Sequence, residues 1–107
     1  MNLVDGFISY IEAERRYSPL TVRNYRRDIA DFLEFIGVEA ERFDPNAIAR
    51  ADVEEWIVYL FEKRKLKAQS VNRSVATLRS FWKWMLGHGH ASRNVVKIIP
   101  QAKTSSP

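Results

Sequence analysis

The sequence predicts an all-α domain made of four helices. Apolar residues recur at helical spacing in four separate stretches of the 107-residue chain. No stretch shows sustained alternation of polar and apolar residues with β-branched enrichment, which is the pattern typical of strands. Because 46% of the residues are hydrophobic and a chain of this length rarely divides, we expect one core and one domain.

The first two helices have distinct start and stop signals. The first helix is predicted from its apolar face, which is formed by Leu3, Val4, Phe7, Ile8 and Ile11. It gives way to a turn at residues 15–17. Ser18 and Pro19 are typical of an N-cap followed by the first helical residue, where a missing N–H is no loss. The second helix is predicted from its apolar face, which is formed by Val22, Tyr25, Ile29, Phe32, Leu33 and Ile36. Gly37 is placed to end it.

The third and fourth helices follow a connector. Residues 38–51 carry Pro45 and no long periodic set, so they predict a connection with a short turn at residues 46–48. The third helix is predicted from its apolar face, which is formed by Val53, Trp56, Ile57, Leu60 and Phe61. The basic residues 63–65 follow at its C-terminal end, where the helix dipole favours positive charge. The fourth is expected over residues 68–86, burying Val71, Val75, Leu78, Trp82 and Met85 and ending at residues 87–89.

The last residues predict a linker rather than more of the core. Pro100 and the Thr, Ser and Pro residues of the tail are typical of a segment that leads to a further domain. We therefore expect a helical domain over residues 1–99, the start of a linker over residues 100–107, and a protein that continues beyond this chain.

Charge is distributed unevenly along the chain. Residues 1–62 hold seven Lys/Arg and all 13 Asp/Glu, a net charge of −6, whereas residues 63–107 hold ten Lys/Arg and no acidic residue. A basic segment of this kind favours a polyanionic partner, so nucleic acid is the first candidate. A solvated basic surface without such a partner is the alternative from charge alone.

The outward face of the second helix carries the first set of candidate contacts. On a helical wheel, Arg23, Asn24, Arg27 and Asp31 face away from the apolar residues. The arginines lie in the N-terminal half of this helix and the acids in the C-terminal half, which opposes the helix dipole. We infer that the arginines serve something other than folding. The alternative is a solvated, self-paired face in which Arg27 and Asp31 form an i, i+4 pair.

The fourth helix presents small and amide-bearing groups between flanking cations. Its outward face holds Gln69, Asn72, Arg73, Ala76, Thr77 and Ser80, with Arg79 and Lys83 at the edges. This composition suits a helix in the major groove of duplex DNA, where amides and arginine read base edges and cations hold phosphates. Trp84 points partly outward, and packing under the following loop, docking of a partner and contact with a neighbouring domain are its alternatives.

We expect neither a catalytic site nor a metal or cofactor site. The chain has no cysteine, and His88 and His90 have no third ligand nearby, so they predict a polar turn at a helix end. Residues 90–93 spell H-x-x-R on a loop without a second catalytic cluster, which we interpret as coincidence. No window approaches the roughly 18 apolar residues of a membrane span, and no signal peptide begins the chain. We expect a cytoplasmic protein without membrane contact.

Two segments resemble a known family. Residues 18–29 (SPLTVRNYRRDI) are followed by FLEF at 32–35, and residues 70–73 (SVNR) are followed by LRSFWKW at 78–84. Their order and spacing are similar to those of the N-terminal core-binding domain of the tyrosine recombinases, the Xer-like and phage-integrase family. The similarity spans residues 3–103.

This resemblance implies a SAM-like four-helix bundle that clamps one face of double-stranded DNA. It also implies a C-terminal catalytic domain, absent from this chain, and a whole protein that assembles as a tetramer on DNA. The fragment itself is then not an enzyme, and Tyr10, Tyr17, Tyr25 and Tyr59 are not nucleophiles. A helical protein-interaction or oligomerisation module is the alternative function.

The helical wheels and the resemblance together predict two rows of DNA contacts. They are Thr21, Arg23, Asn24 and Arg27 on the second helix, and Gln69, Asn72, Arg73, Arg79 and Lys83 on the fourth. Arg27, Arg79 and Lys83 are assigned to phosphates, and Asn72 and Arg73 to base edges or to closely held phosphates. Capping and solvation of the helix is the alternative role for Asn72 and Arg73.

Overall fold

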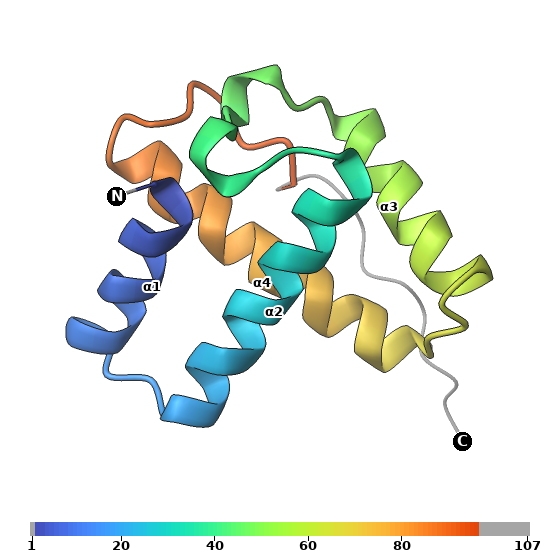
Figure 1. Cartoon of the computed structure of the whole chain (residues 1–107), viewed down its shortest axis with the longest axis horizontal. Helices are drawn as coiled ribbons and strands as arrows, with labels where there is room; N and C mark the ends of the chain where they lie inside the picture. The colour runs from blue at the N-terminus through green and yellow to red at the C-terminus, as the bar shows by residue number, and fades with distance from the viewer. Residues whose placement is uncertain (1, 97–107) are drawn as a thin grey trace.

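The computed structural model describes residues 2–96, which fold into four α-helices with short connections (Figure 1). The helices are α1 (Leu3–Ala13), α2 (Pro19–Ile36), α3 (Arg50–Glu62) and α4 (Ala68–Gly87). Two 3-10 turns, η1 (Ala40–Arg42) and η2 (Pro45–Ala47), lie between α2 and α3, and the described residues contain no strand. The predicted all-α class and its four helices are confirmed.

The central element of the fold is α4, which packs against each of the other three helices. All five residues predicted to be buried on this helix are buried, and Phe81, which the prediction omitted, is buried with them. The ring centroid of Phe32 on α2 lies 5.2 Å from that of Trp56 on α3 and 6.2 Å from that of Trp82 on α4. These three rings join three helices in one aromatic core.

The helix ends follow the local signals in the sequence. The Ser18 hydroxyl oxygen accepts a hydrogen bond from the Thr21 backbone N–H at 3.2 Å, and Pro19 is the first helical residue of α2. Gly37 ends α2 with a φ of 72°, a left-handed conformation that favours glycine. Helix α3 begins at Arg50, because the Asp52 carboxylate accepts from the Ala49 backbone N–H at 2.8 Å and so caps the helix.

Replacing Ser18 with alanine is expected to lower the free energy of unfolding by about 1 kcal/mol, because α2 then loses its side-chain cap. Urea denaturation followed by far-UV circular dichroism measures the change. Ser18→Asp is the matched control, since aspartate also caps helices and suits the positive end of the dipole. A Ser18→Ala protein as stable as the Ser18→Asp protein would contradict the prediction.

The segments between and after the helices contribute to the core in a way that the sequence did not indicate. Phe43 and Ile48 of the connector are buried, as are Val95 and Val96 after α4. The Asn46 side-chain oxygen accepts from the Ser92 backbone N–H at 2.8 Å and from its hydroxyl at 3.0 Å. The connector and the segment after α4 therefore pack together. The predicted linker, residues 100–107, lies outside the described residues.

Within the described part of the chain, no helix has the length and apolar character needed to cross a membrane.

Candidate nucleic-acid interface

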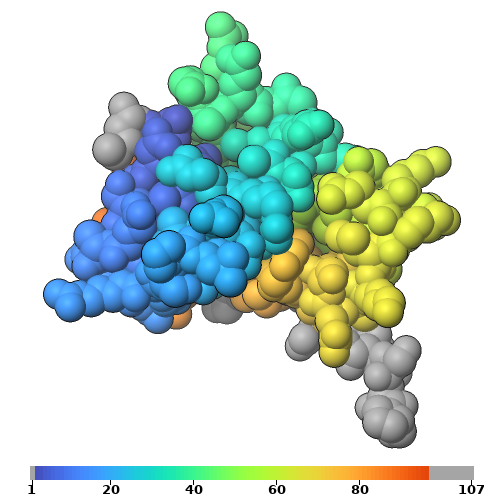
Figure 2. All heavy atoms as spheres, turned by 60° about the horizontal axis from the view of Figure 1, so that its bottom comes forward, coloured from blue at the N-terminus to red at the C-terminus, as the bar shows by residue number. Residues whose placement is uncertain are grey.

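The nine predicted contact residues lie on α2 and α4, two helices that pack against each other. The side chains of Arg23, Arg27, Gln69, Arg73 and Lys83 are exposed, and those of Thr21, Asn24, Asn72 and Arg79 are half-buried. Figure 2 shows α2, in blue and cyan, beside the yellow and orange N-terminal half of α4 on one face of the molecule. The α4 row extends from Gln69 to Lys83, about 21 Å at the rise of an α-helix.

A buried carboxylate joins the two helices. Asp28 of α2 is 1% exposed, and it accepts hydrogen bonds from the Thr77 hydroxyl at 2.8 Å and from the Ser74 hydroxyl at 3.4 Å, both on α4. The placement of Thr77 on the outward face of the fourth helix was wrong, because this residue is also 1% exposed. The helical wheel did not show that α2 covers this flank of α4.

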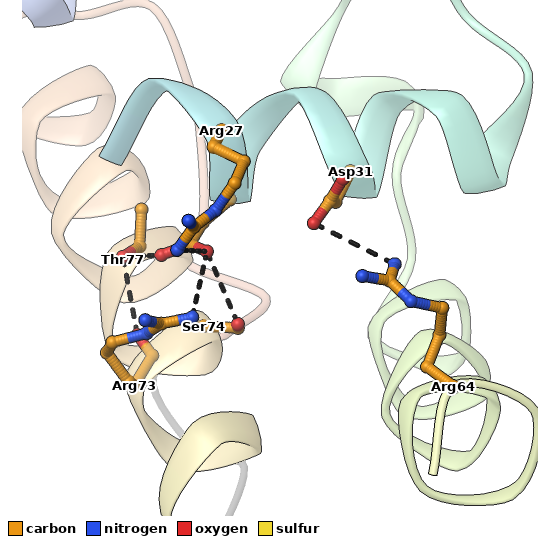
Figure 3. A network of polar contacts seen from close by, with 7 residues as sticks. Arg27, Asp31, Arg64, Arg73, Ser74 and Thr77 are labelled. Atoms are coloured by element: carbon orange, nitrogen blue, oxygen red, sulfur yellow. Dashed lines mark hydrogen bonds and ion pairs between the residues drawn. The ribbon is translucent and has the colours of Figure 1, made fainter. Parts of the chain in front are cut away.

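Two arginines, one from each predicted row, contact the same oxygen of Asp28. The Nη2 atom of Arg73 lies 3.5 Å from Asp28 Oδ1, and the Nη2 atom of Arg27 lies 3.9 Å from it (Figure 3). Their side chains remain 50% and 53% exposed, whereas that of Asp28 is 2% exposed. Both guanidinium groups therefore meet at the junction of α2 and α4 and remain accessible to solvent.

The i, i+4 pair of Arg27 and Asp31, which belonged to the alternative interpretation of this face, is replaced by two other ion pairs. Arg27 contacts Asp28, and the Asp31 carboxylate lies 3.8 Å from Nη1 of Arg64, in the turn after α3 (Figure 3). Burial raises the pKa of Asp31 above its ordinary value, and the nearby Arg64 guanidinium opposes that rise. The arginine thus links α2 to the end of α3.

Sequence reasoning missed Asp28, Ser74 and Arg64 as members of this site. Arg64 belongs to the basic run at residues 63–65, which was interpreted as a favourable end of a helix dipole and as part of the basic segment, without a specific contact. Asp28 was counted as an acid at the wrong end of its helix. The available signal was that Asp28 lies about one helical turn from Tyr25 and Phe32, two members of the predicted apolar face.

Ser80 and Lys83 of α4 line one side of a groove. The groove has a volume of about 420 Å³ and is lined largely by aromatic side chains, including Tyr10, Tyr25 and Trp84. Burial raises the pKa of Tyr25 above its ordinary value. The Trp84 ring packs on α1, with its centroid 5.8 Å from that of Phe7. The Trp84 ring centroid also lies 5.1 Å from that of His88 and 5.4 Å from that of His90, so of its alternatives the structure shows packing under the residues that follow α4.

The histidines at the end of α4 make contacts typical of a helix end. His88 Nδ1 lies 2.9 Å from the Trp84 carbonyl oxygen, to which it donates as the Nδ1–H tautomer, and the His88 and His90 rings stack with centroids 6.4 Å apart. The described residues hold no cluster of three or more His, Cys, Asp or Glu side chains that could bind a metal ion.

Comparisons with known proteins found similar sequences and similar folds. Residues 4–89 match the family model described as "Phage integrase, N-terminal SAM-like domain". The chain is 33% identical over 104 residues to the tyrosine recombinase XerC of Oceanobacillus iheyensis, covering 97% of this chain and 33% of that protein. The chain therefore spans about a third of the length of this curated relative.

Two solved structures share the fold. One is a lambda integrase dimer bound to a COC' core site, with a TM-score of 0.78 and 19% identity, covering 97% of this chain and 34% of the integrase chain. The other is the integrase from mycobacterium phage Brujita, with a TM-score of 0.80 and 18% identity, covering 98% of this chain and 33% of that chain.

Proposed function

The chain belongs to the phage integrase N-terminal SAM-like domain family, and from this membership we propose that it binds duplex DNA as the core-binding domain of a tyrosine recombinase. The observation that carries the proposal is the meeting of Arg27 and Arg73 at the junction of α2 and α4. Each guanidinium is about half exposed, and arginine binds phosphate oxygens through strong, charge-assisted hydrogen bonds.

The charge of the surrounding surface supports the same partner. The turn between α3 and α4 adds Lys63, Lys65 and Lys67, all exposed, to the same end of α4 that carries Arg73. Within the two predicted rows, Arg27, Arg79 and Lys83 are proposed to bind phosphates. Asn72 and Arg73 are proposed to contact base edges or closely held phosphates. Thr21, Arg23, Asn24 and Gln69 complete the proposed interface.

The activity of the whole protein is also a proposal. Because the curated relative is a tyrosine recombinase three times as long as the matched region, we propose that a C-terminal domain supplies DNA cleavage and rejoining. The domain described above would occupy residues 1–99, and residues 100–107 would begin the linker. Assembly as a tetramer on DNA and a cytoplasmic location follow from this proposed function, and the fragment itself would have no catalytic activity.

The test is a salt titration of DNA binding. Fluorescence anisotropy with a labelled synthetic duplex is expected to show weak binding, with a Kd of about 10⁻⁴ to 10⁻⁶ M at physiological salt. The logarithm of the binding constant should fall linearly with the logarithm of the salt concentration, by about 0.9 for each phosphate contacted. Absence of binding to any duplex at low salt, including a recombination site of a relative, would refute the proposal.

Sedimentation of the free chain separates this function from the alternative. Leu20, Val58 and Leu86 are the exposed large hydrophobic residues of the described region, and they lie on three different helices. A stable dimer whose dissociation is insensitive to salt would favour a protein-interaction or oligomerisation module, because apolar burial is not screened by ions.

A further inference from the structure

We propose that Asp28 is a positioning residue that holds Arg27 and Arg73 as a two-guanidinium clamp for one backbone phosphate of duplex DNA. The proposal rests on the proposed DNA-binding function and assigns the two arginines to a single site. It also gives a role to a buried acid that the rows of predicted contacts do not include.

Asp28 is almost completely buried between α2 and α4. A buried carboxylate is costly unless hydrogen bonds and opposite charges compensate its lost hydration. Thr77 and Ser74 of α4 donate their hydroxyl groups to it, at 2.8 and 3.4 Å. These bonds come from successive turns of α4, so they define where the carboxylate sits relative to that helix. Asp28 Oδ1 is thereby held at the edge of the α2–α4 junction.

The guanidinium groups of Arg27 and Arg73 share one oxygen of this carboxylate. Nη2 of Arg73 and Nη2 of Arg27 lie 3.5 and 3.9 Å from the same Oδ1 atom, so the two groups are neighbours although they come from different helices. A guanidinium has five N–H donors, and contact through one nitrogen leaves donors on the others for a second acceptor. Figure 3 shows both side chains directed to this point.

The cluster of Asp28, Arg27 and Arg73 carries a net positive charge. One carboxylate balances only one of the two guanidinium charges, so the cluster as a whole attracts an anion. A phosphate has several acceptor oxygens and can accept from both arginines at once. Because Asp28 already restricts the two long side chains, less rotamer entropy is lost when the phosphate binds. The positioned pair should therefore bind a phosphate more tightly than two independent arginines.

The proposal predicts an effect opposite to that of simple electrostatics. If Asp28 only held the fold together, its replacement by a neutral residue in a folded protein would strengthen DNA binding, because a negative charge leaves the interface. If Asp28 positions the arginines, the same replacement weakens binding. The sign of the change distinguishes the two roles.

The experiment measures anisotropy of a labelled mixed-sequence duplex with the whole 107-residue chain, after circular dichroism has confirmed folding. Asp28→Asn is expected to raise the Kd about fivefold at a fixed moderate salt concentration. A factor of this size corresponds to the free energy needed to immobilise one or two long side chains at an interface. Glu34→Gln is the matched control, because Glu34 is an exposed acid on the same helix. This control is expected to leave the Kd unchanged or slightly lower.

A second comparison tests whether Asp28 acts through the arginines. Asp28→Asn is introduced into a protein that already carries Arg27→Ala and Arg73→Ala, and no further weakening is expected there. The same weakening in both backgrounds would overturn the proposal. A folded Asp28→Asn protein that binds the duplex as tightly as the wild type, or more tightly, would overturn it as well.

A further variant serves if Asp28→Asn does not fold. Thr77→Val removes the shorter hydrogen bond and leaves the carboxylate charge, and Thr77→Ser retains the hydroxyl as its control. Weaker binding by Thr77→Val alone supports the proposal, and equal binding by both variants overturns it. A wild-type chain that binds no duplex refutes the proposed function itself. This outcome is distinguishable from a failure of the role proposed for Asp28, because it is seen before any residue is replaced.

Discussion

Replacing Trp82 with alanine is expected to lower the free energy of unfolding by about 3–5 kcal/mol, the range for large aromatic residues removed from a core. Trp82 is 0% exposed and contacts the rings of Phe32, Phe43 and Phe81. Its indole Nε1 finds no hydrogen-bond acceptor among the described residues, so the loss is one of packing. Urea denaturation followed by far-UV circular dichroism measures the effect.

Leu86→Ala is the control for this substitution on the same helix. Leu86 is 42% exposed, and its truncation is expected to change stability by less than about 1 kcal/mol. Domains of this size are usually stable by about 5–15 kcal/mol, so the Trp82→Ala protein should lose a large fraction of its stability and unfold at a much lower urea concentration. If the two variants had equal stability, the central position of Trp82 in the core would be contradicted.

The double replacement Arg27→Ala and Arg73→Ala is expected to weaken duplex binding by about 2 kcal/mol, which is roughly thirtyfold in Kd. This value is typical of the contribution of hydrogen bonds to charged groups. Because both arginines are proposed to bind one phosphate, the salt slope should fall by about 0.9, the value for a single contact. Two independent phosphate sites would instead lower the slope by about twice that amount. Anisotropy titrations across a range of salt concentrations measure both quantities.

Arg42→Ala with Arg50→Ala is the matched control, because it removes the same net charge from exposed side chains elsewhere on the molecule. Arg42 lies in η1, and Arg50 begins α3, where it pairs with Glu54 at 3.4 Å. This control should weaken binding only slightly. Equal losses of affinity in the two double variants would show that net charge, rather than the α2–α4 junction, determines binding.

Much of the fold could be predicted because its signals are local. The cap at Ser18 and the stop at Gly37 depend on side-chain and backbone chemistry within one turn, and both occur as predicted. The buried faces of α2 and α4 follow from helical periodicity, since a residue's angle around its own helix is set by its position in the sequence. The recombinase family was identified from motifs on these same two helices.

The contact roles of the nine residues remain predictions, but their locations illustrate the limit of a helical wheel. A wheel gives the direction of a side chain from its own axis and does not show which flank a neighbouring helix covers. Thr77 was therefore placed outward although α2 covers it, and Arg27 was paired with Asp31 although Asp28 is the acid that it contacts.

By itself, the sequence determined the helices, the caps of α2, most of the core and the concentration of positive charge after residue 62. Only the tertiary structure decided that Asp28 is buried between α2 and α4, that Arg73 and Arg27 meet on it, and that Arg64 reaches Asp31 from the end of α3. The physical reason is range. Caps and periodicity act within a few residues, whereas Asp28 and Thr77 are 49 positions apart and become neighbours only when the core aligns their helices.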